Sequence, residues 1–160
     1  MATVYKKSRN VAASIYYHIK QELIEDGLTS WTILKGFKRA YTTQMPVIAI
    51  RNGTDIYNSA EIGSTRVVKN HTIFIDIFAR DETEKFDVKD WLFDVVRDGC
   101  DFYEHTAETD GVIEKIVNGK LIVLNVREQE IKTGDEKSVY AEHDKHRYLL
   151  ILTVTTGEVE

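Results

Sequence analysis

The segment from Val67 to Arg80 constrains the fold more than any other part of the sequence. In an extended chain, successive side chains point to opposite faces. One face would carry Ile73, Ile75 and Ile77, and the other Phe74, Asp76 and Phe78. A strand that is apolar on both faces has to be covered on both. We therefore expect a long strand with the chain's own helices over one face, and another subunit as a candidate cover for the second.

Two helices are predicted by apolar stripes with helical spacing. The first covers residues 8–26 and carries its stripe at Val11, Ile15, Ile19 and Leu23. Ser8 or Asn10 can cap its first amides, and Gly27 supplies the left-handed residue that ends it. The second helix is expected to begin at Asp87, after a polar connection over residues 81–86. Its stripe is Val88, Trp91, Leu92, Val95 and Val96, with Asp90 completing a capping-box-like pair and Phe86 packing onto Trp91.

The remaining segments favour strands and turns. A short strand is expected over residues 47–50 after Pro46, followed by a turn at Asn52-Gly53. Residues 54–66 are expected to form a long exposed loop, in which 55–57 can form a short strand. Residues 112–130 are predicted to form a hairpin around a type I′ turn at Asn118-Gly119, and 147–155 a final strand. Residues 31–41 are left as a loop or irregular edge, and the charged stretch 132–146 as a flexible loop. These elements predict one α+β domain over residues 1–160, with a mostly antiparallel or mixed sheet packed by two main helices.

Composition narrows the class of function. The chain has 160 residues, enough for a core, and a net charge of −5, whereas nucleic-acid binding normally needs a basic surface. Cys100 is the only cysteine, so no internal disulfide is possible and a reducing compartment is expected. No apolar run approaches the roughly 18 residues of a membrane span, and the N-terminus is not a signal peptide.

Catalytic and metal-binding patterns are weak. A metal site could be assembled from His143 and His146 with Asp144, Glu142 and His105. Zinc sites, however, need three or four ligands fixed by rigid elements, and residues 132–146 are predicted to be flexible. No phosphate-binding glycine loop or nucleophile elbow occurs. Cys100 is expected to pack behind the second helix. We expect no catalytic residue, no metal and no cofactor.

Asp76 stands out because it interrupts an apolar strand face. It is either a buried carboxylate with a raised pKa or, as we favour, the partner of an Arg or Lys, or a residue at a subunit boundary. Aromatic residues that fall outside the predicted core favour a protein interface over a nucleic-acid surface. Trp31 and Tyr57 are among them.

Four short motifs resemble the tail-terminator (tail-completion) proteins of long-tailed bacteriophages. They are Pro46-Val47-Ile48, Glu61-Ile62-Gly63-Ser64, the run from Ile75 to Glu82, and Asp87-Val88-x-Asp90-x-Leu92. In that family a similar acidic, apolar, Gly-Ser turn precedes a strand ending in an Asp-Ile-Phe-Ala-like sequence, and an acidic loop leads to a capped helix. The resemblance covers roughly residues 45–105, and related head–tail joining and minor tail proteins have similar size and patterning.

The resemblance implies a structural virion protein, assembled in the host cytoplasm. It would form a homo-oligomeric ring, hexameric in this family, on the end of the tail tube. The ring would stop tube polymerisation and present a surface to the head connector or completion protein in the phage neck. DNA would pass through its acidic lumen without specific binding, and no membrane would be involved. The expected oligomer or tail-tube contacts are Phe74, Asp76, Phe78, Tyr57, Glu61 and Trp31.

Three alternatives stay open at this point. The nearest is another neck protein, acting in head–tail joining or head completion. A small metal-dependent hydrolase built from Asp76, His105 and His143 is the second. A nucleic-acid-binding module is the third, and the acidic net charge counts against it.

Overall fold

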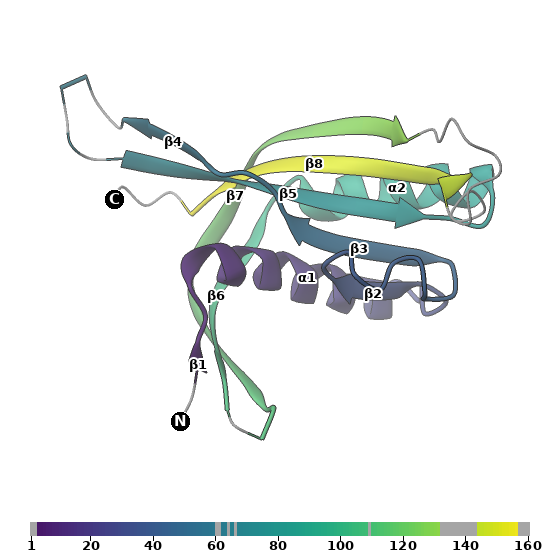
Figure 1. Cartoon of the computed structure of the whole chain (residues 1–160), viewed down its shortest axis with the longest axis horizontal. Helices are drawn as coiled ribbons and strands as arrows, with labels where there is room; N and C mark the ends of the chain where they lie inside the picture. Colours follow the sequence, from purple (N-terminus) through teal and green to yellow (C-terminus); the bar gives the residue numbers. More distant parts are fainter. Residues whose placement is uncertain are drawn as a thin grey trace.

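The computed structural model describes residues 3–59, 62, 63, 65, 67–108, 110–131 and 144–156. Its elements in chain order are β1 (Thr3–Val4), α1 (Lys7–Glu25), β2 (Thr32–Lys35), β3 (Val47–Asn52), β4 (Ile56–Ser59), β5 (Val67–Phe78), α2 (Glu82–Val96), β6 (Cys100–Ala107), β7 (Ile113–Ile131) and β8 (Arg147–Thr155). The strands form one curled sheet in the order β1-β6-β7-β8-β5-β3-β2, and β4 also pairs with β5 (Figure 1). Among these pairs only β2–β3 is parallel. The predicted α+β class, with two helices on a mixed and mostly antiparallel sheet, is confirmed.

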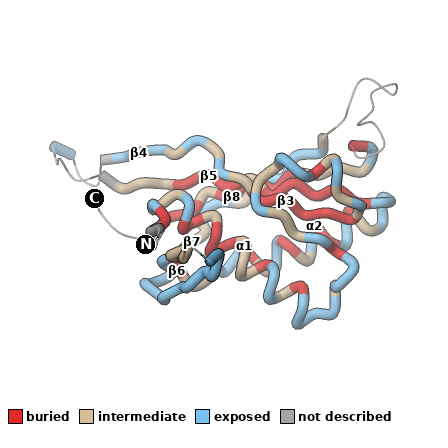
Figure 2. The backbone as a smooth tube through the Cα atoms, turned by 60° about the horizontal axis from the view of Figure 1, so that its bottom comes forward, coloured by how far each residue is buried: buried red, intermediate tan, exposed pale blue. Residues whose placement is uncertain are grey.

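The main core lies between the two helices and the inner face of the sheet. The apolar stripe of α1 packs with that of α2 against Ile73, Ile75 and Ile77, which are fully buried. In Figure 2 burial is concentrated in β3, β5, β8 and one side of α1. The helical spacing therefore identified the correct faces, because the side chains of an amphipathic helix must meet the apolar face of the sheet.

The second face of β5 is covered by the chain itself. Phe78 is fully buried with Ala40, Val47 and Ala49, and Phe37, Tyr41 and Met45 pack against this cluster. Ala40, Phe37, Tyr41 and Met45 belong to the connection between β2 and β3, which folds back over the outer face. Around Phe78 and Asp76 the cover is therefore intramolecular, and the second subunit proposed for this face has no access to either side chain.

Both helix starts differ from the prediction. The N-cap of α1 is Lys6, without a side-chain cap, because Ser8 bonds to Asp55 and Asn10 is buried against β6. The end at Gly27 is confirmed, with φ +72°. α2 starts more than a turn early: Asp81 is its N-cap and accepts a hydrogen bond from the Glu84 amide at 2.8 Å.

Asn118-Gly119 is not a hairpin turn, so that prediction was wrong. These two residues lie within β7 opposite the single residue Phe102, where the β6–β7 register shifts, and they form a β-bulge with Gly119 at φ +106°. The hairpin turn lies at residues 108–112, where the Glu108 amide donates to the carbonyl of Val112 at 2.9 Å. β6, absent from the prediction, is the other strand of this hairpin.

The expected turn at Asn52-Gly53 was also wrong. β3 and β4 pair successively with the same edge of β5, and the Gly53 amide donates to the Thr72 carbonyl at 2.7 Å. The chain therefore continues along β5, and β4 overlaps the short strand expected at 55–57 within the predicted loop. The strands predicted from residues 47, 67 and 147 are confirmed as β3, β5 and β8.

Candidate functional site

Two β-hairpins project from the body of the molecule. One is formed by β4 and the first part of β5, and the other by β6 and the first part of β7 (Figure 1). We name them the β4–β5 arm and the β6–β7 arm. Ile116 and Val117 are adjacent in β7, so they point to opposite faces, yet 72% and 56% of their surfaces are exposed. The β6–β7 arm is thus open to solvent on both faces at these positions.

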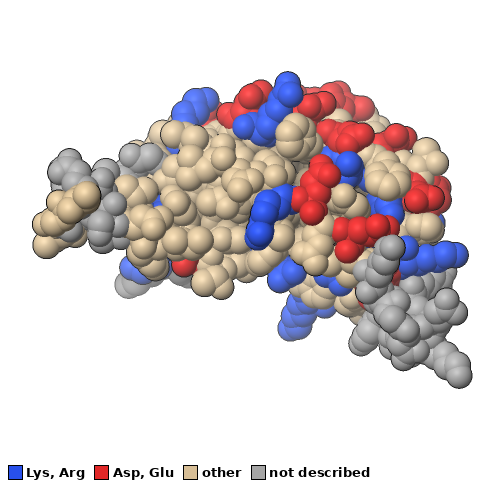
Figure 3. All heavy atoms as spheres, turned by 90° about the horizontal axis from the view of Figure 1, so that it is seen from above, with Lys and Arg blue, Asp and Glu red and all other residues tan. Residues whose placement is uncertain are grey.

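Exposed apolar side chains continue along the arms and β7. We define the β7 strip as Ile116, Val117, Ile122 and Leu124, all more than one third exposed. The β4–β5 arm adds Ile56, Tyr57 and Ile62. Figure 3 shows that the left part of the upper face carries few charged residues, whereas acidic and basic side chains crowd the right part. Grouped exposed apolar residues of this kind mark binding surfaces.

Asp76 is the centre of a buried ionic network. Its carboxylate accepts hydrogen bonds from Arg51 Nε at 2.9 Å and from Arg147 Nη2 at 2.8 Å, and it has no exposed surface. Arg147 also donates to the Tyr41 hydroxyl at 3.2 Å, and Tyr41 donates to Asp144 at 2.8 Å. The predicted pairing of Asp76 with a basic residue is confirmed. The network joins β3, β5 and β8 to the β2–β3 connection, so its role here is structural.

Aromatic rings complete this network. Phe37 lies beneath both guanidinium groups, with ring centroids 5.4 Å from Arg51 and 5.0 Å from Arg147. Phe74 lies 4.4 Å from Arg51 and is only half-buried. Desolvation, with the hydrogen bond to Asp144, raises the pKa of Tyr41 to about 12, so Tyr41 stays a neutral donor at neutral pH.

The remaining residues predicted as oligomer or tail-tube contacts differ in how far they are exposed. Trp31 is buried in the main core, next to the start of β2. Tyr57 is 61% exposed on the β4–β5 arm, where Lys69 lies 5.2 Å from its ring. Glu61 lies outside the described residues. Of the predicted set, Tyr57 and Phe74 therefore remain with accessible surface, whereas the β7 strip escaped the prediction because its segment was taken as an ordinary hairpin.

The residues of the hydrolase alternative do not come together. His105 lies on β6 and Asp76 on β5, with β7 and β8 between them in the sheet. Three inter-strand spacings, about 14 Å in total, therefore separate these two strands. His143 and Glu142 lie outside the described residues. In the part of the chain that the structure describes, no group of three or more His, Cys, Asp or Glu side chains could hold a metal ion.

His105 is instead enclosed by aromatic rings. Tyr5 and Tyr17 stack on it with centroid distances of 5.8 Å and 5.4 Å, and Asn10 Oδ1 lies 3.2 Å from its Nδ1. Asn10 Oδ1 also accepts a hydrogen bond from the backbone amide of His105 at 2.9 Å. Burial lowers the pKa of His105, and the neighbouring Lys35 and Lys115 lower it further. A neutral, fully buried imidazole of this kind holds α1 on β6.

Two further candidate nucleophile sites lack catalytic geometry. Ser8 donates to Asp55 at 3.1 Å and Asp55 lies 3.4 Å from His71 Nδ1, so the acid stands between the hydroxyl and the imidazole. In a catalytic triad the imidazole must contact the hydroxyl directly. Burial raises the pKa of the Cys100 thiol to about 12, which keeps it protonated and consistent with packing.

Comparison with known proteins adds no relative to this picture. No family model and no curated protein matches the chain. Neither helix of the described part of the chain is long and apolar enough to cross a membrane. The functional interpretation therefore rests on the surface: two projecting arms and the β7 strip.

Proposed function

We propose that this chain is a structural subunit that assembles into a ring, in the manner of the tail-terminator proteins it resembles in sequence. The ring caps the end of a bacteriophage tail tube, ends its polymerisation and offers a surface for head attachment. The observation that carries the proposal is the pair of projecting β-arms with apolar residues exposed on them. An isolated subunit gains nothing by exposing such arms, whereas a neighbouring subunit can bury them.

The arrangement suits a ring because the arms differ from the body in shape. A heterologous contact places one surface of a subunit on a different surface of the next, and closes into a ring when the rotation permits. Either arm can extend over the body of a neighbour, with the β7 strip as part of the buried area. The fully desolvated centres of such interfaces are depleted in charged residues, as is the left part of the upper face in Figure 3.

The electrostatics agree with passage of DNA through a lumen. The chain carries 26 acidic and 21 basic residues, and an acidic ring would not retain the phosphate backbone. Under this proposal the partners are further copies of the chain, the tail tube protein and the head connector.

Deletion of the gene from its parent genome, followed by electron microscopy, tests the proposal. We expect full heads beside separate tails of uncontrolled length. Detached tails of normal length would instead assign the protein to head–tail joining. Intact infectious particles would refute a virion role.

Complementation of the deletion with surface variants tests the β7 strip. Ile122→Ser with Leu124→Ser removes two exposed apolar side chains and should leave the fold intact, with stability changed by about 0.5 kcal/mol per site or less. We expect this variant to fail to control tail length. The matched control is Ile24→Ser with Phe93→Ser, which removes two exposed apolar side chains from the helices. Equal complementation by both variants would remove the strip from the interface.

A further inference from the structure

A pocket with a basic rim lies between the first half of α1 and the end of β2 and β3. Its volume is about 270 Å³. Ala12, Ala13 and Ile50 supply apolar walls, with the rings of Tyr5 and Tyr16 beside them. Three cationic side chains line it: Arg9, Lys35 and Arg51. No acidic residue is among the lining residues.

Two of these cations, Arg9 and Lys35, contact aromatic rings but form no ion pair in the described chain. Arg9 forms no hydrogen bond or ion pair with any described residue, and its guanidinium lies 3.5 Å from the centroid of the Tyr5 ring. Lys35 donates one hydrogen bond, to the Tyr17 hydroxyl at 3.0 Å, and has no acidic partner in the described chain. Arg51 uses Nε for Asp76 and retains further N–H donors. A protein with five more acidic than basic residues thus leaves Arg9 and Lys35 without a carboxylate in its described part, whereas Arg51 is paired with Asp76.

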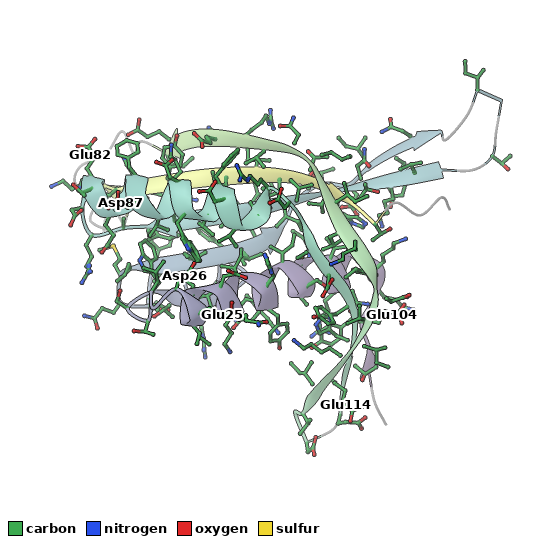
Figure 4. The ribbon with its side chains drawn as sticks, turned by 180° about the vertical axis from the view of Figure 1, so that it is seen from behind. Glu25, Asp26, Glu82, Asp87, Glu104 and Glu114 are labelled. Atoms are coloured by element: carbon green, nitrogen blue, oxygen red, sulfur yellow. The ribbon has the colours of Figure 1, made fainter. Side chains whose placement is uncertain are left out.

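The absence of acids here is local. Figure 4 shows the opposite side of the molecule, with six acidic side chains labelled on α2, on the C-terminal end of α1 and on the β6–β7 hairpin. None of these residues lines the pocket. Among the lining residues, an anionic group from outside would therefore meet N–H donors and no carboxylate.

The chemistry of the lining selects among anions. Arg9 offers a planar fork that matches a carboxylate, and Lys35 adds a point charge. The alanine, isoleucine and tyrosine walls suit the hydrocarbon stem that carries a glutamate or aspartate carboxylate. Inorganic phosphate has no such stem.

We propose that this pocket is a docking site for an acidic peptide segment of a partner protein, with a carboxylate held by Arg9 and Lys35. The proposal does not depend on the ring function, because it concerns only the isolated subunit and its ligand. Aromatic and apolar walls would exclude water around the carboxylate and strengthen its ion pairs.

Fluorescence anisotropy with a fluorescein-labelled hexaglutamate peptide tests the proposal on the full chain. The test variant is Arg9→Gln with Lys35→Gln, two changes at exposed positions. The matched control, Lys38→Gln with Arg39→Gln, removes the same charges from exposed residues outside the lining. Each charge-assisted hydrogen bond to the carboxylate contributes to the free energy of peptide binding. We therefore expect the Kd of the test variant to rise at least about tenfold, and the Kd of the control to equal that of the wild type.

Three results would overturn the proposal. The first is no binding of hexaglutamate by the wild type. The second is equal weakening in both variants, which would indicate a general charge effect. The third is preferential binding of inorganic phosphate or of a single-stranded oligonucleotide in competition, which would assign the pocket to phosphate chemistry. Hexaglutamine should not bind in any case, and thermal melting of each variant confirms that it is folded.

Discussion

Replacement of Asp76 by Asn isolates the contribution of the buried charge, because the two side chains have nearly the same shape. The change leaves Arg51 and Arg147 facing each other without their shared anion. Removal of one partner from a buried pair costs about 3–5 kcal/mol. The Arg147 side chain is 13% exposed and Arg51 is 35% exposed, so solvent screens part of the Arg51 charge. We therefore expect the lower end, about 3 kcal/mol of lost unfolding free energy.

Urea denaturation measures this loss directly, and thermal melting should show a decrease in Tm of about 6–12 °C for a domain of this size. Asp90→Asn is the matched control, because Asp90 is 74% exposed beside Lys89 and its loss should change stability by at most about 0.5 kcal/mol. Since Arg147 also reaches Tyr41, limited proteolysis of the variant should become faster within residues 36–46. A stability loss under about 1 kcal/mol would refute the view that this network holds the outer face together.

Other perturbations follow from the same coordinates. Gly99→Ala should be far more destabilising than Gly111→Ala, although both glycines have positive φ. A Cβ at Gly99 would collide with a backbone carbonyl of β7, whereas a Cβ at Gly111 would enter open space. Similar melting temperatures of the two variants would contradict this packing. Phe78→Asp should unfold the subunit because Phe78 is fully buried, and a folded monomer by circular dichroism would reopen the intermolecular interpretation of that face. Burial lowers the pKa of both His71 and His105 below the unfolded value near 6.5, so their contribution to stability is complete above pH 6.5 and is lost as pH falls below it. Urea midpoints measured from pH 7.5 to 5 should therefore decrease, and less steeply when both histidines are replaced by Gln; an unchanged slope would show that they do not carry the effect.

Local chemistry determined the helices, the central strand and the fold class. The stripes of both helices and the alternation in residues 73–78 depend only on neighbours along the chain. So does the end of α1, where Gly27 adopts a conformation that other residues adopt at a cost. These patterns have the same meaning in any tertiary context, and the structure agrees with them.

The candidate site was less predictable. Tyr57 and Phe74 retain accessible surface, whereas Asp76, Phe78 and Trp31 are buried. Whether an aromatic residue outside a helical stripe faces solvent depends on which segment folds over it, and that is a long-range property. The β7 strip comes from two short apolar runs, residues 116–117 and 121–124, which are also typical of strands covered on both faces, so the sequence does not indicate that these side chains lack a cover.

Tertiary structure alone decided which strands pair and what covers each face. Asn118-Gly119 and residues 110–111 are both good turn sequences, and β7 continues through the first because the residues on both sides of it pair with β6. Similarly, the outer face of β5 is closed by residues 36–46, held through Tyr41 and Arg147, which are 106 positions apart in the chain. Periodicity is a local property of the chain. Strand pairing and the burial of a sheet face instead require segments distant in sequence to meet, and their favourable free energy is gained only when those segments come together.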